Sequence, residues 1–335
     1  MVQVAQAVSA RARGNPAGVA LPGGWIVRDE AIMGTAIHVE LWCDDARQGQ
    51  RAVDAVIAEM HRIDCAMSPF KPNSQLSHIN RYAAQQAVPL SAEMYTLIDR
   101  AIHYSRLSDG AFDITYASVG RLYDYRAGIA PADAQVAAAR EGIGWRHLVL
   151  DRAARSLRFG HPLTAIDLGG FAKGHAVDNA AAILLRHGIE HAIVSAGGDS
   201  RILGDRRGRP WTIAIRHPRD PKRHVAVLPL EDTAISTSGD YERYFERDGV
   251  RHHHVIDPRT GRSAGGVHSV TILAADGLTA EALSKILFVL GVERGMPIVE
   301  SQPGADAVVV DAEGVLHCSA GLRPPSNNSN LPSHP

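Results

Sequence analysis

The sequence has few cysteines, almost no net charge and no long apolar run. Its three cysteines (Cys43, Cys65 and Cys318) are odd in number and form no C-x-x-C pair, which argues against a disulfide framework. No apolar stretch approaches the roughly 18 to 20 residues needed to cross a bilayer, so we expect no membrane span. A formal net charge of -1 argues against nucleic acid as a partner, because duplex binding needs a basic face.

The N-terminus also lacks the pattern of a secretory signal. Arg11 and Arg13 are not followed by an apolar segment, because Pro16, Gly18 and Pro22 interrupt it. The chain as it stands is therefore expected to be cytoplasmic. A periplasmic location would require a natural leader that is absent from this chain.

The composition, with 45% apolar and 21% charged residues among 335, is that of a globular protein with a sizeable core. Apolar periodicity predicts helices over 48–66, 91–107, 131–141 and 278–290, the second with Ser91 as its N-cap. Strands are expected at 36–42, 147–150, 156–159, 191–195, 211–216, 224–228, 252–256, 268–274 and 306–310. Strands and helices do not alternate regularly, so we predict an α+β fold. Residues 1–24 are expected to be a flexible lead and residues 323–335 a disordered tail.

The densest motif is the run D-L-G-G-F-A-K-G-H-A-V-D over residues 167–178. A strand ending there, with a helix starting near Phe171, would aim helix-terminal N–H groups at an anion such as a phosphate. Lys173 would add a positive charge, and the glycines allow a ligand to approach the backbone closely. The glycine spacing differs from that of the Walker A loop and of the dinucleotide fingerprint. Taken alone, the run could equally be a tight turn with a surface lysine.

Other blocks accompany this run in a fixed order. They are M-G-T at 33–35, S-P-F-K-P-N-S-Q-L-S-H-I-N at 68–80, G-A-F-D-I-T at 110–115, A-G-G-D at 196–199, T-S-G-D-Y at 237–241 and H-H-V-I-D-P-R-T-G at 253–261. Together they resemble the FAD:protein FMN transferase (ApbE-type) family, from about residue 33 to about residue 291. The resemblance implies two interlocked subdomains of mixed sheet and helices within residues 25–322, with a flavin-nucleotide cleft between them.

The resemblance implies transfer of FMN from FAD to a Ser or Thr hydroxyl of a partner protein, with release of AMP. Such a reaction needs groups that bind a diphosphate and neutralise developing charge. Gly169, Gly170 and Lys173 would do this, and Asp178 would reach the ribose or the adenine. Met33 would lie on the isoalloxazine ring, although without the resemblance it reads as an ordinary core methionine.

The same resemblance makes His254 the catalytic base, because a histidine of near-neutral pKa can take a proton from a hydroxyl. Asp257 either orients that histidine or holds the turn that follows. In isolation, the three adjacent histidines would instead be a solvated surface or a weak metal site. Further contacts to the flavin nucleotide are implied for Ser74, Asn80, Asp113, Ser238, Gly239, Asp240 and Thr260. Asn80 and Asp113 could also simply cap local structure, and residues 238–241 could be a plain β-turn.

One block departs from the family pattern. The family's last block carries an Asp and, four residues later, a Thr that bind Mg²⁺, whereas this chain has Glu281 and Lys285. The spacing would allow these two to form an ion pair on one helix face. A charged lysine offers no lone pair, so it cannot replace a hydroxyl ligand. Two alternatives follow: Mg²⁺ is still held by Glu281 and the Ala172 backbone, or the Lys285 ammonium takes the place of the metal and acts in catalysis.

The sequence therefore predicts an enzyme that uses FAD as its substrate. The resemblance implies an acceptor protein that carries a motif of the form Asp-x-x-[Ser/Thr]-Gly-Ala-[Ser/Thr]. Because of the altered pair at positions 281 and 285, two alternatives stay open. One is an FAD-binding carrier or sensor without transferase activity, and the other is an FAD pyrophosphatase that uses water in place of the acceptor hydroxyl.

Overall fold

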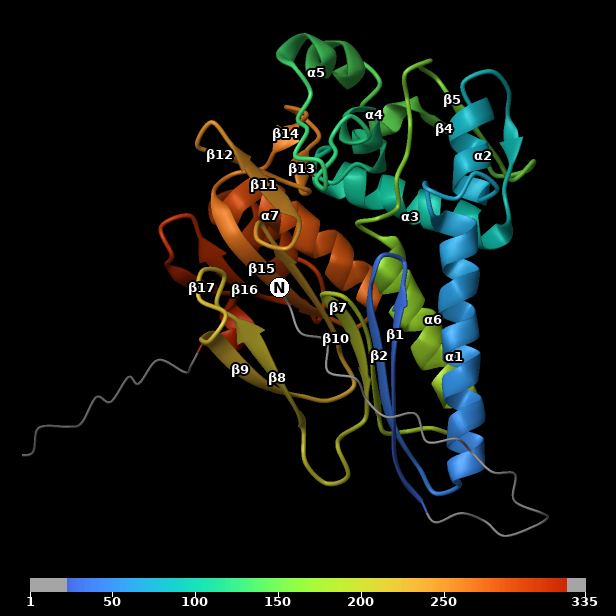
Figure 1. The fold of residues 1–335 in the computed structure, drawn as a ribbon, viewed down its shortest axis with the longest axis vertical. Coiled ribbons are helices and arrows are strands. Elements are labelled where there is room, and N and C mark those ends of the chain that lie inside the picture. Colours follow the sequence, from blue (N-terminus) through green and yellow to red (C-terminus); the bar gives the residue numbers. More distant parts are fainter. Residues whose placement is uncertain (1–22, 324–335) are drawn as a thin grey trace, which may run out of the picture.

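The computed structural model describes residues 23–323, and an eight-stranded sheet lies at its centre (Figure 1). Its order is β1-β2-β6-β7-β10-β15-β16-β17, and each of these pairings is antiparallel. The strands are β1 (Gly24–Ile32), β2 (Thr35–Cys43), β6 (Ala192–Ala196), β7 (Asp199–Leu203), β10 (Ala234–Gly239), β15 (Val267–Ala274), β16 (Asp306–Asp311) and β17 (Leu316–Cys318). The lead and tail expected at 1–24 and 323–335 lie outside the described residues except at their inner ends, where Gly24 begins β1.

Three long helices cover one face of this sheet. They are α1 (Ala46–Met67), α6 (Ala172–Arg186) and α7 (Gly277–Glu300), and α6 packs between the other two (Figure 1). Asp45 caps α1 by accepting hydrogen bonds from the next turn. Gly291 kinks α7, because its φ of 73° is outside the helical region. No helix within residues 23–323 is both long and apolar enough to cross a membrane.

A hairpin covers the opposite face. Its strands are β8 (Trp211–Arg216) and β9 (His224–Leu230), and Trp211 packs with Ile193, Ile202 and Ile235 of the sheet in a separate small core. Since both faces of the central strands are covered, the sheet residues of β6, β7 and β10 are mostly buried. The sequences of β7 (D-S-R-I-L) and β10 (A-I-S-T-S-G) are nevertheless rich in polar residues, so they show neither the alternation nor the continuous apolar run that reveals a strand.

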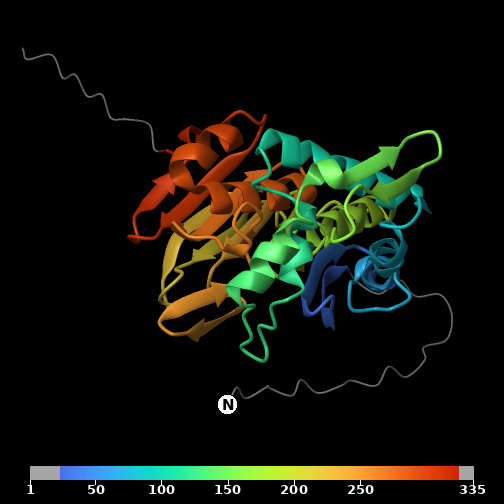
Figure 2. The ribbon, with the colours of Figure 1, turned by 90° about the horizontal axis from the view of Figure 1, so that it is seen from above.

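The remaining elements gather above one end of the sheet (Figures 1 and 2). They are α2 (Gln75–Tyr82), α3 (Ala92–Leu107), α4 (Ala117–Gly120), α5 (Asp133–Arg140), the small sheet β3 (Val88–Pro89), β5 (Ser156–Phe159) and β4 (Leu148–Asp151), and the ribbons β11 (Tyr244–Arg247) with β12 (Val250–His253) and β13 (Ile256–Asp257) with β14 (Arg262–Ser263). The division into two subdomains stays a prediction.

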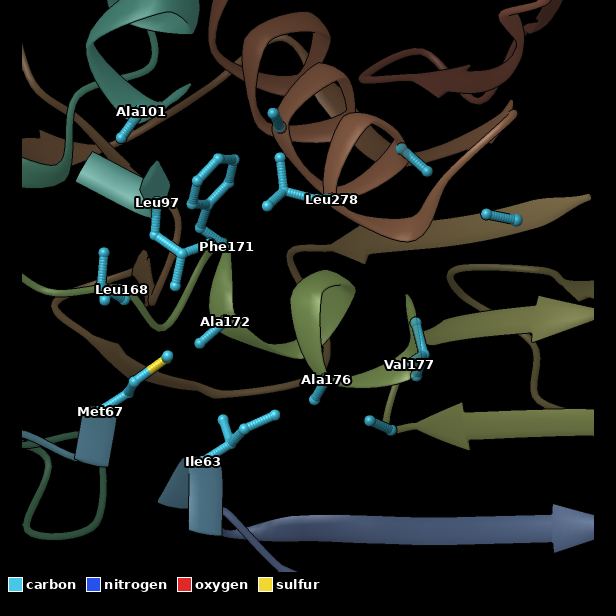
Figure 3. Close-up of a cluster of buried hydrophobic side chains, with 14 of the residues drawn as sticks. Ile63, Met67, Leu97, Ala101, Leu168, Phe171, Ala172, Ala176, Val177 and Leu278 are labelled. Atoms are coloured by element: carbon cyan, nitrogen blue, oxygen red, sulfur yellow. The ribbon is translucent and has the colours of Figure 1, made fainter. Parts of the chain in front are cut away.

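Phe171, at the start of α6, anchors this upper group to the sheet layer. Its ring is fully buried and lies 6.0 Å from the ring of Tyr104 and 5.4 Å from that of Phe112. Leu97 and Leu278 from α3 and α7 close around it (Figure 3). The glycine turn before α6 is therefore held in place by the core on its C-terminal side.

Most predicted helices and strands are confirmed, with three differences, one of which (the segment before the glycine turn) is described with the site below. The strand expected at 252–256 is divided, because β12 ends at His253 and β13 begins at Ile256. Residues 238–241 are not simply a turn: Ser238 and Gly239 complete β10, and the chain turns from Asp240 onward.

Candidate functional site

The segment before the glycine turn is extended but is not a strand. Asn80 takes the role of a strand partner: its amide donates to the Ile166 carbonyl and accepts from the Ile166 N–H, both at 2.8 Å. The Asp167 N–H donates to the Ile114 carbonyl at 3.0 Å. The strand expected here is therefore absent, because side chains and an irregular loop satisfy its backbone groups.

The glycine turn leaves two backbone donors without a partner. The N–H groups of Gly169 and Ala172 are bound to the Asp167 carboxylate and the Leu168 carbonyl, each at 2.6 Å. Within residues 23–323, nothing accepts from the N–H groups of Gly170 and Lys173. As α6 begins at Ala172, these two donors lie at a helix N-terminus, where an anion is favoured.

Gly174 and Asp178 join α6 to α7. A Cβ on Gly174 would lie 2.3 Å from the carbonyl oxygen of Gly277, so only glycine permits this close helix contact. The Asp178 carboxylate accepts from the N–H groups of Gly277 at 2.7 Å and Leu278 at 3.0 Å. Asp178, which was expected to reach the nucleotide, therefore caps the start of α7.

Lys173 pairs with two buried carboxylates. Its ammonium donates to Asp199 Oδ2 at 2.5 Å and to Glu281 Oε1. Burial opposes the charge of Lys173, but Asp199 and Glu281 outweigh it and raise the pKa of the ammonium. Only one of its three N–H donors remains for a ligand.

Glu281 and Lys285 do not form the ion pair that their spacing allows. Both oxygens of Glu281 are engaged, Oε1 by Lys173 and Oε2 by the Gly174 N–H at 2.8 Å. Burial and the nearby Asp199 raise the pKa of Glu281. The Lys285 ammonium donates instead to Ser238 Oγ at 2.6 Å.

Lys285 lies across the glycine turn. A Cβ on Gly170 would stand 3.4 Å from Lys285 Cε, so the lysine stem passes directly over this glycine. Burial and then the positive charge of Lys173 lower the pKa of Lys285. The lysine stem thus packs against the glycine turn, where the N–H of Gly170 is uncommitted.

A chain of buried hydroxyls lies behind these charges, and of its members only Ser238 was predicted from the sequence. Ser238 Oγ lies 2.9 Å from Ser284 Oγ, which lies 3.3 Å from Ser236 Oγ. Ser236 donates to Asp199 Oδ1 at 2.5 Å. Asp199 follows two glycines within one of the resemblance blocks, and this was the signal that could have identified it.

His254 lies in the loop just after β12. Its Nδ1 is buried and has no partner within the described chain, and its N–H donates to the Arg243 carbonyl at 3.1 Å. Burial and the positive charges of Lys285 and Arg243 lower the pKa of His254 to about 3. The neighbouring His253 is committed, since its Nε2 lies 2.8 Å from the Ala264 carbonyl. His254 is therefore neutral and close to Lys285.

The carboxylates of Asp257 and Asp240 are held by arginines. Asp257 accepts from Arg259 Nε and Nη2, both at 2.9 Å, so of the two roles considered it holds the turn. Thr260 donates from Oγ1 to the Asp257 carbonyl at 3.4 Å within the same turn. Asp240 receives two bonds from Arg219, at 2.6 and 2.5 Å.

Met33 and Gly34 form the tip between β1 and β2. Both have positive φ (56° and 68°), as a two-residue hairpin turn of type I′ requires. They line a cleft of about 500 Å³ together with His61, Asp64 and Lys71. Arg243, which sequence reasoning also missed, connects this tip to the His254 loop by donating from Nη2 to the Gly34 carbonyl at 3.0 Å.

Ser74 and Asp113 cap local structure. Ser74 is the N-cap of α2 and accepts from the Ser77 N–H at 2.9 Å. Asp113 is buried and accepts from Thr115 and from the Trp145 N–H at 2.7 Å. Burial raises the pKa of Asp113. Their contacts position the loops around the glycine turn.

The donor set does not suit a divalent metal at positions 281 and 285. Both Glu281 oxygens already accept hydrogen bonds, and the Lys285 ammonium has no lone pair to offer. No cluster of three or more His, Cys, Asp or Glu side chains that could hold a metal ion occurs within residues 23–323. The Ala172 backbone alone would be an insufficient ligand.

Comparison with known proteins identifies relatives that all belong to one family. The ApbE family model matches residues 33–309. The FAD:protein FMN transferase of Vibrio cholerae is 36% identical over 264 residues, 77% of this chain and 78% of that protein. That of Treponema pallidum is 31% identical over 314 residues, 88% of this chain and 87% of that protein. The crystal structure of the ApbE protein of Thermotoga maritima has a TM-score of 0.83 at 33% identity, covering 89% of this chain and 98% of that one. These likenesses confirm the predicted α+β fold.

Proposed function

Because this chain belongs to the ApbE family, we propose that it is an FAD:protein FMN transferase, with FAD as its substrate and a protein as its acceptor. The observation that carries the proposal is one juxtaposition. The uncommitted N–H groups of Gly170 and Lys173, the Lys285 ammonium and the neutral His254 lie together beside the glycine turn. Two donors and a cation suit a diphosphate, and the histidine suits a proton transfer.

The reaction is a substitution at phosphorus. The oxygen of an acceptor Ser or Thr hydroxyl forms a bond to the phosphorus of the FMN half. The bond from that phosphorus to the bridging oxygen breaks, and AMP leaves with the electron pair. His254 takes the proton that the hydroxyl loses, while the cation and N–H donors offset the charge that develops on the diphosphate.

His254 is suited to this role only with the substrate bound. In the free protein, burial and the charges of Lys285 and Arg243 keep its pKa near 3, which makes it a weak base. A bound diphosphate carries negative charge into the same region and raises that pKa toward neutrality. Substrate binding therefore activates the base.

The other predicted residues fall into two groups. Met33 lies on the wall of the cleft and packs against the isoalloxazine ring. Gly169, Ser238 and Gly239 supply the turn and strand end that surround the diphosphate. The remaining residues hold the loops of the site in position through the contacts described above. They are Ser74, Asn80, Asp113, Asp178, Asp240, Asp257 and Thr260.

Two finer points belong to the same proposal. The acceptor presents a motif of the form Asp-x-x-[Ser/Thr]-Gly-Ala-[Ser/Thr], and the enzyme acts in the cytoplasm unless a leader directs it to the periplasm. No step uses Mg²⁺, because Glu281 and Lys285 do not provide its ligands.

The test is incubation with FAD and an acceptor that carries the motif, followed by flavin fluorescence of the denatured acceptor and separation of the nucleotides. Transfer gives a fluorescent acceptor and one AMP per flavin bound. Free FMN with AMP, and no labelled acceptor, would instead indicate a pyrophosphatase. FAD that is bound but unchanged would indicate a carrier or sensor.

His254→Ala tests the base. We expect the transfer rate to fall on the order of 10²- to 10⁴-fold, while FAD affinity changes little, because the base acts on the acceptor hydroxyl. The matched control is His224→Ala, an exposed histidine on β9, for which no change is expected. An unchanged transfer rate in the His254 variant would remove the histidine from the mechanism.

A further inference from the structure

Two lysines reach into the polar cluster, but only one of them is neutralised. Lys173 has two carboxylate partners, whereas Lys285 forms no salt bridge within residues 23–323. Within the described residues its one hydrogen bond is to the neutral Ser238 hydroxyl, so two of its three donors are free. A half-buried ammonium without a counter-ion is costly unless an anion completes its environment.

The position of Lys285 identifies where that anion sits. Its stem crosses Gly170, whose N–H is uncommitted, at the N-terminus of α6. A phosphate oxygen placed there can accept from the ammonium and from the backbone at once. Lysine binds phosphate as a point charge in this way.

A divalent ion is disfavoured in the same place. Any ion bound near Glu281 would lie close to both Lys173 and Lys285, and both positive charges would repel it, a divalent ion more strongly than a monovalent one. The two carboxylates that could offset this repulsion already have partners. Glu281 accepts from Lys173 and the Gly174 N–H, and Asp199 accepts from Lys173 and Ser236. Lys173 and Lys285 together balance the two carboxylates, so the cluster holds no excess negative charge for a divalent ion.

We propose that Lys285 is a built-in cation for the FAD diphosphate, which makes FAD binding independent of a divalent metal. This rests on the proposed function for the identity of the ligand. The mechanism needs one positive charge on the diphosphate from the side of α7, and the chain supplies it covalently rather than by recruiting an ion.

The experiment is calorimetric titration of FAD and of riboflavin, each in excess EDTA and in excess Mg²⁺. For the unmodified protein we expect the same FAD affinity in both conditions. Lys285→Met should weaken FAD roughly 10- to 100-fold, the factor for losing a hydrogen bond from a charged group, and leave riboflavin unchanged. Lys222→Thr, an exposed lysine between β8 and β9, is the matched control and should bind FAD normally.

The double variant Glu281→Asp with Lys285→Thr restores the pair found in the family. FAD affinity that becomes dependent on Mg²⁺ in this variant would support displacement of the metal by lysine. Two results would overturn the proposal: loss of FAD binding in EDTA for the unmodified protein, or an equal loss of FAD and riboflavin affinity in Lys285→Met. Riboflavin affinity serves as the control for correct folding, because riboflavin has the same ring as FAD but lacks the diphosphate.

Transfer is measured separately on the denatured acceptor. Metal-independent FAD binding without transfer would contradict the proposed function while supporting the role of Lys285. If transfer occurs but FAD binding requires Mg²⁺, the result would contradict the role of Lys285 while supporting the proposed function.

Discussion

Lys173 and Lys285 enter the same polar cluster from different helices, and their surroundings are opposite. Lys173, in the motif that dominates the sequence, donates to Asp199 and Glu281. Lys285, at a position where the family pattern has a hydroxyl, donates only to Ser238 among the described residues. The motif lysine thus closes an internal ion-pair network, while the unusual lysine is left to meet a ligand.

This difference shows how a binding site can divide structural and functional charge. The network of Lys173, Asp199 and Glu281 joins α6, β7 and α7 below the glycine turn. It fixes the frame on which the free donors of the turn are presented. Lys285 then acts against a rigid background, which a ligand-binding cation needs.

The largest effect should come from removing the cation of the network. Lys173→Met leaves Asp199 and Glu281 as buried carboxylates without a positive partner, and we expect a loss of about 3–5 kcal/mol in the free energy of unfolding. Lys285→Met should change it by less than about 1 kcal/mol, because no buried carboxylate loses its partner. Urea unfolding of both variants measures the contrast.

Equal losses in the two lysine variants would contradict the division of roles. Asp199→Asn provides a control within the network. It removes one negative charge and keeps the shape of the side chain, so combined with Lys173→Met it should recover part of the lost stability.

A smaller effect separates two glycines of the turn. Gly174→Ala places a methyl group 2.3 Å from the Gly277 carbonyl oxygen, and overpacking of this kind costs about 1–3 kcal/mol of unfolding free energy. Gly170→Ala meets only the flexible stem of Lys285, at 3.4 Å, and should stay within about 0.5 kcal/mol of the unmodified protein.

Thermal unfolding with and without FAD tests this pair of glycines. Gly170→Ala should reduce the stabilisation that FAD provides, because the methyl group packs against the Lys285 stem and hinders the close approach of the diphosphate to the turn. A Gly174 variant as stable as the unmodified protein would mean that α6 and α7 can move apart, against the close contact described here.

The sequence predicted the frame of this site well. Helices α1 and α3 follow from apolar periodicity, and the cap of α3 follows from Ser91, because these signals are local. The glycine turn and the start of α6 at Ala172 were also predictable from the run of glycines after an apolar segment. The resemblance blocks identified the segments that meet at the site.

The partners within the site could not be predicted. Lys173 and Glu281 are 108 residues apart, and Asn80 and Ile166 are 86 apart, so their contacts depend on the whole fold. The spacing of Glu281 and Lys285 suggested an ion pair, but a pattern of four residues cannot reveal a competing lysine from another helix. Strands β7 and β10 were missed for a related reason, since their polar residues face partners elsewhere in the fold and leave neither alternation nor an apolar run in the sequence.

A weaker effect is expected from the hydroxyl that holds Lys285. Ser238→Ala removes the acceptor of the lysine bond, so the ammonium is less well positioned for the diphosphate. We expect FAD to bind roughly two- to tenfold more weakly, because one hydrogen bond contributes about 0.5–1.5 kcal/mol of free energy. Ser195→Ala, whose hydroxyl pairs with Ser200 at 2.8 Å on the sheet, is the control and should leave titration with FAD unchanged. A similar loss in both variants would contradict a specific role for Ser238.

The smallest effect should appear in the pH profile of kcat/KM for FAD, which reports the ionisation of the enzyme before FAD binds. Burial and the charges of Lys285 and Arg243 lower the pKa of His254 to about 3, so the histidine is neutral at every pH above that value. As the neutral form is the one that accepts a proton, His254 should cause no fall in kcat/KM between pH 8 and about pH 5. Lys285→Met removes one nearby positive charge and raises the pKa of His254, while burial, the larger cause, still keeps it below the usual 6.5 or so. The ratio of the variant's kcat/KM to that of the unmodified protein should therefore fall as the pH is lowered, because only the variant begins to lose the neutral histidine. A ratio that stays constant across this range would show that the charge of Lys285 does not act on His254. The two lysines would then differ only in their hydrogen-bond partners.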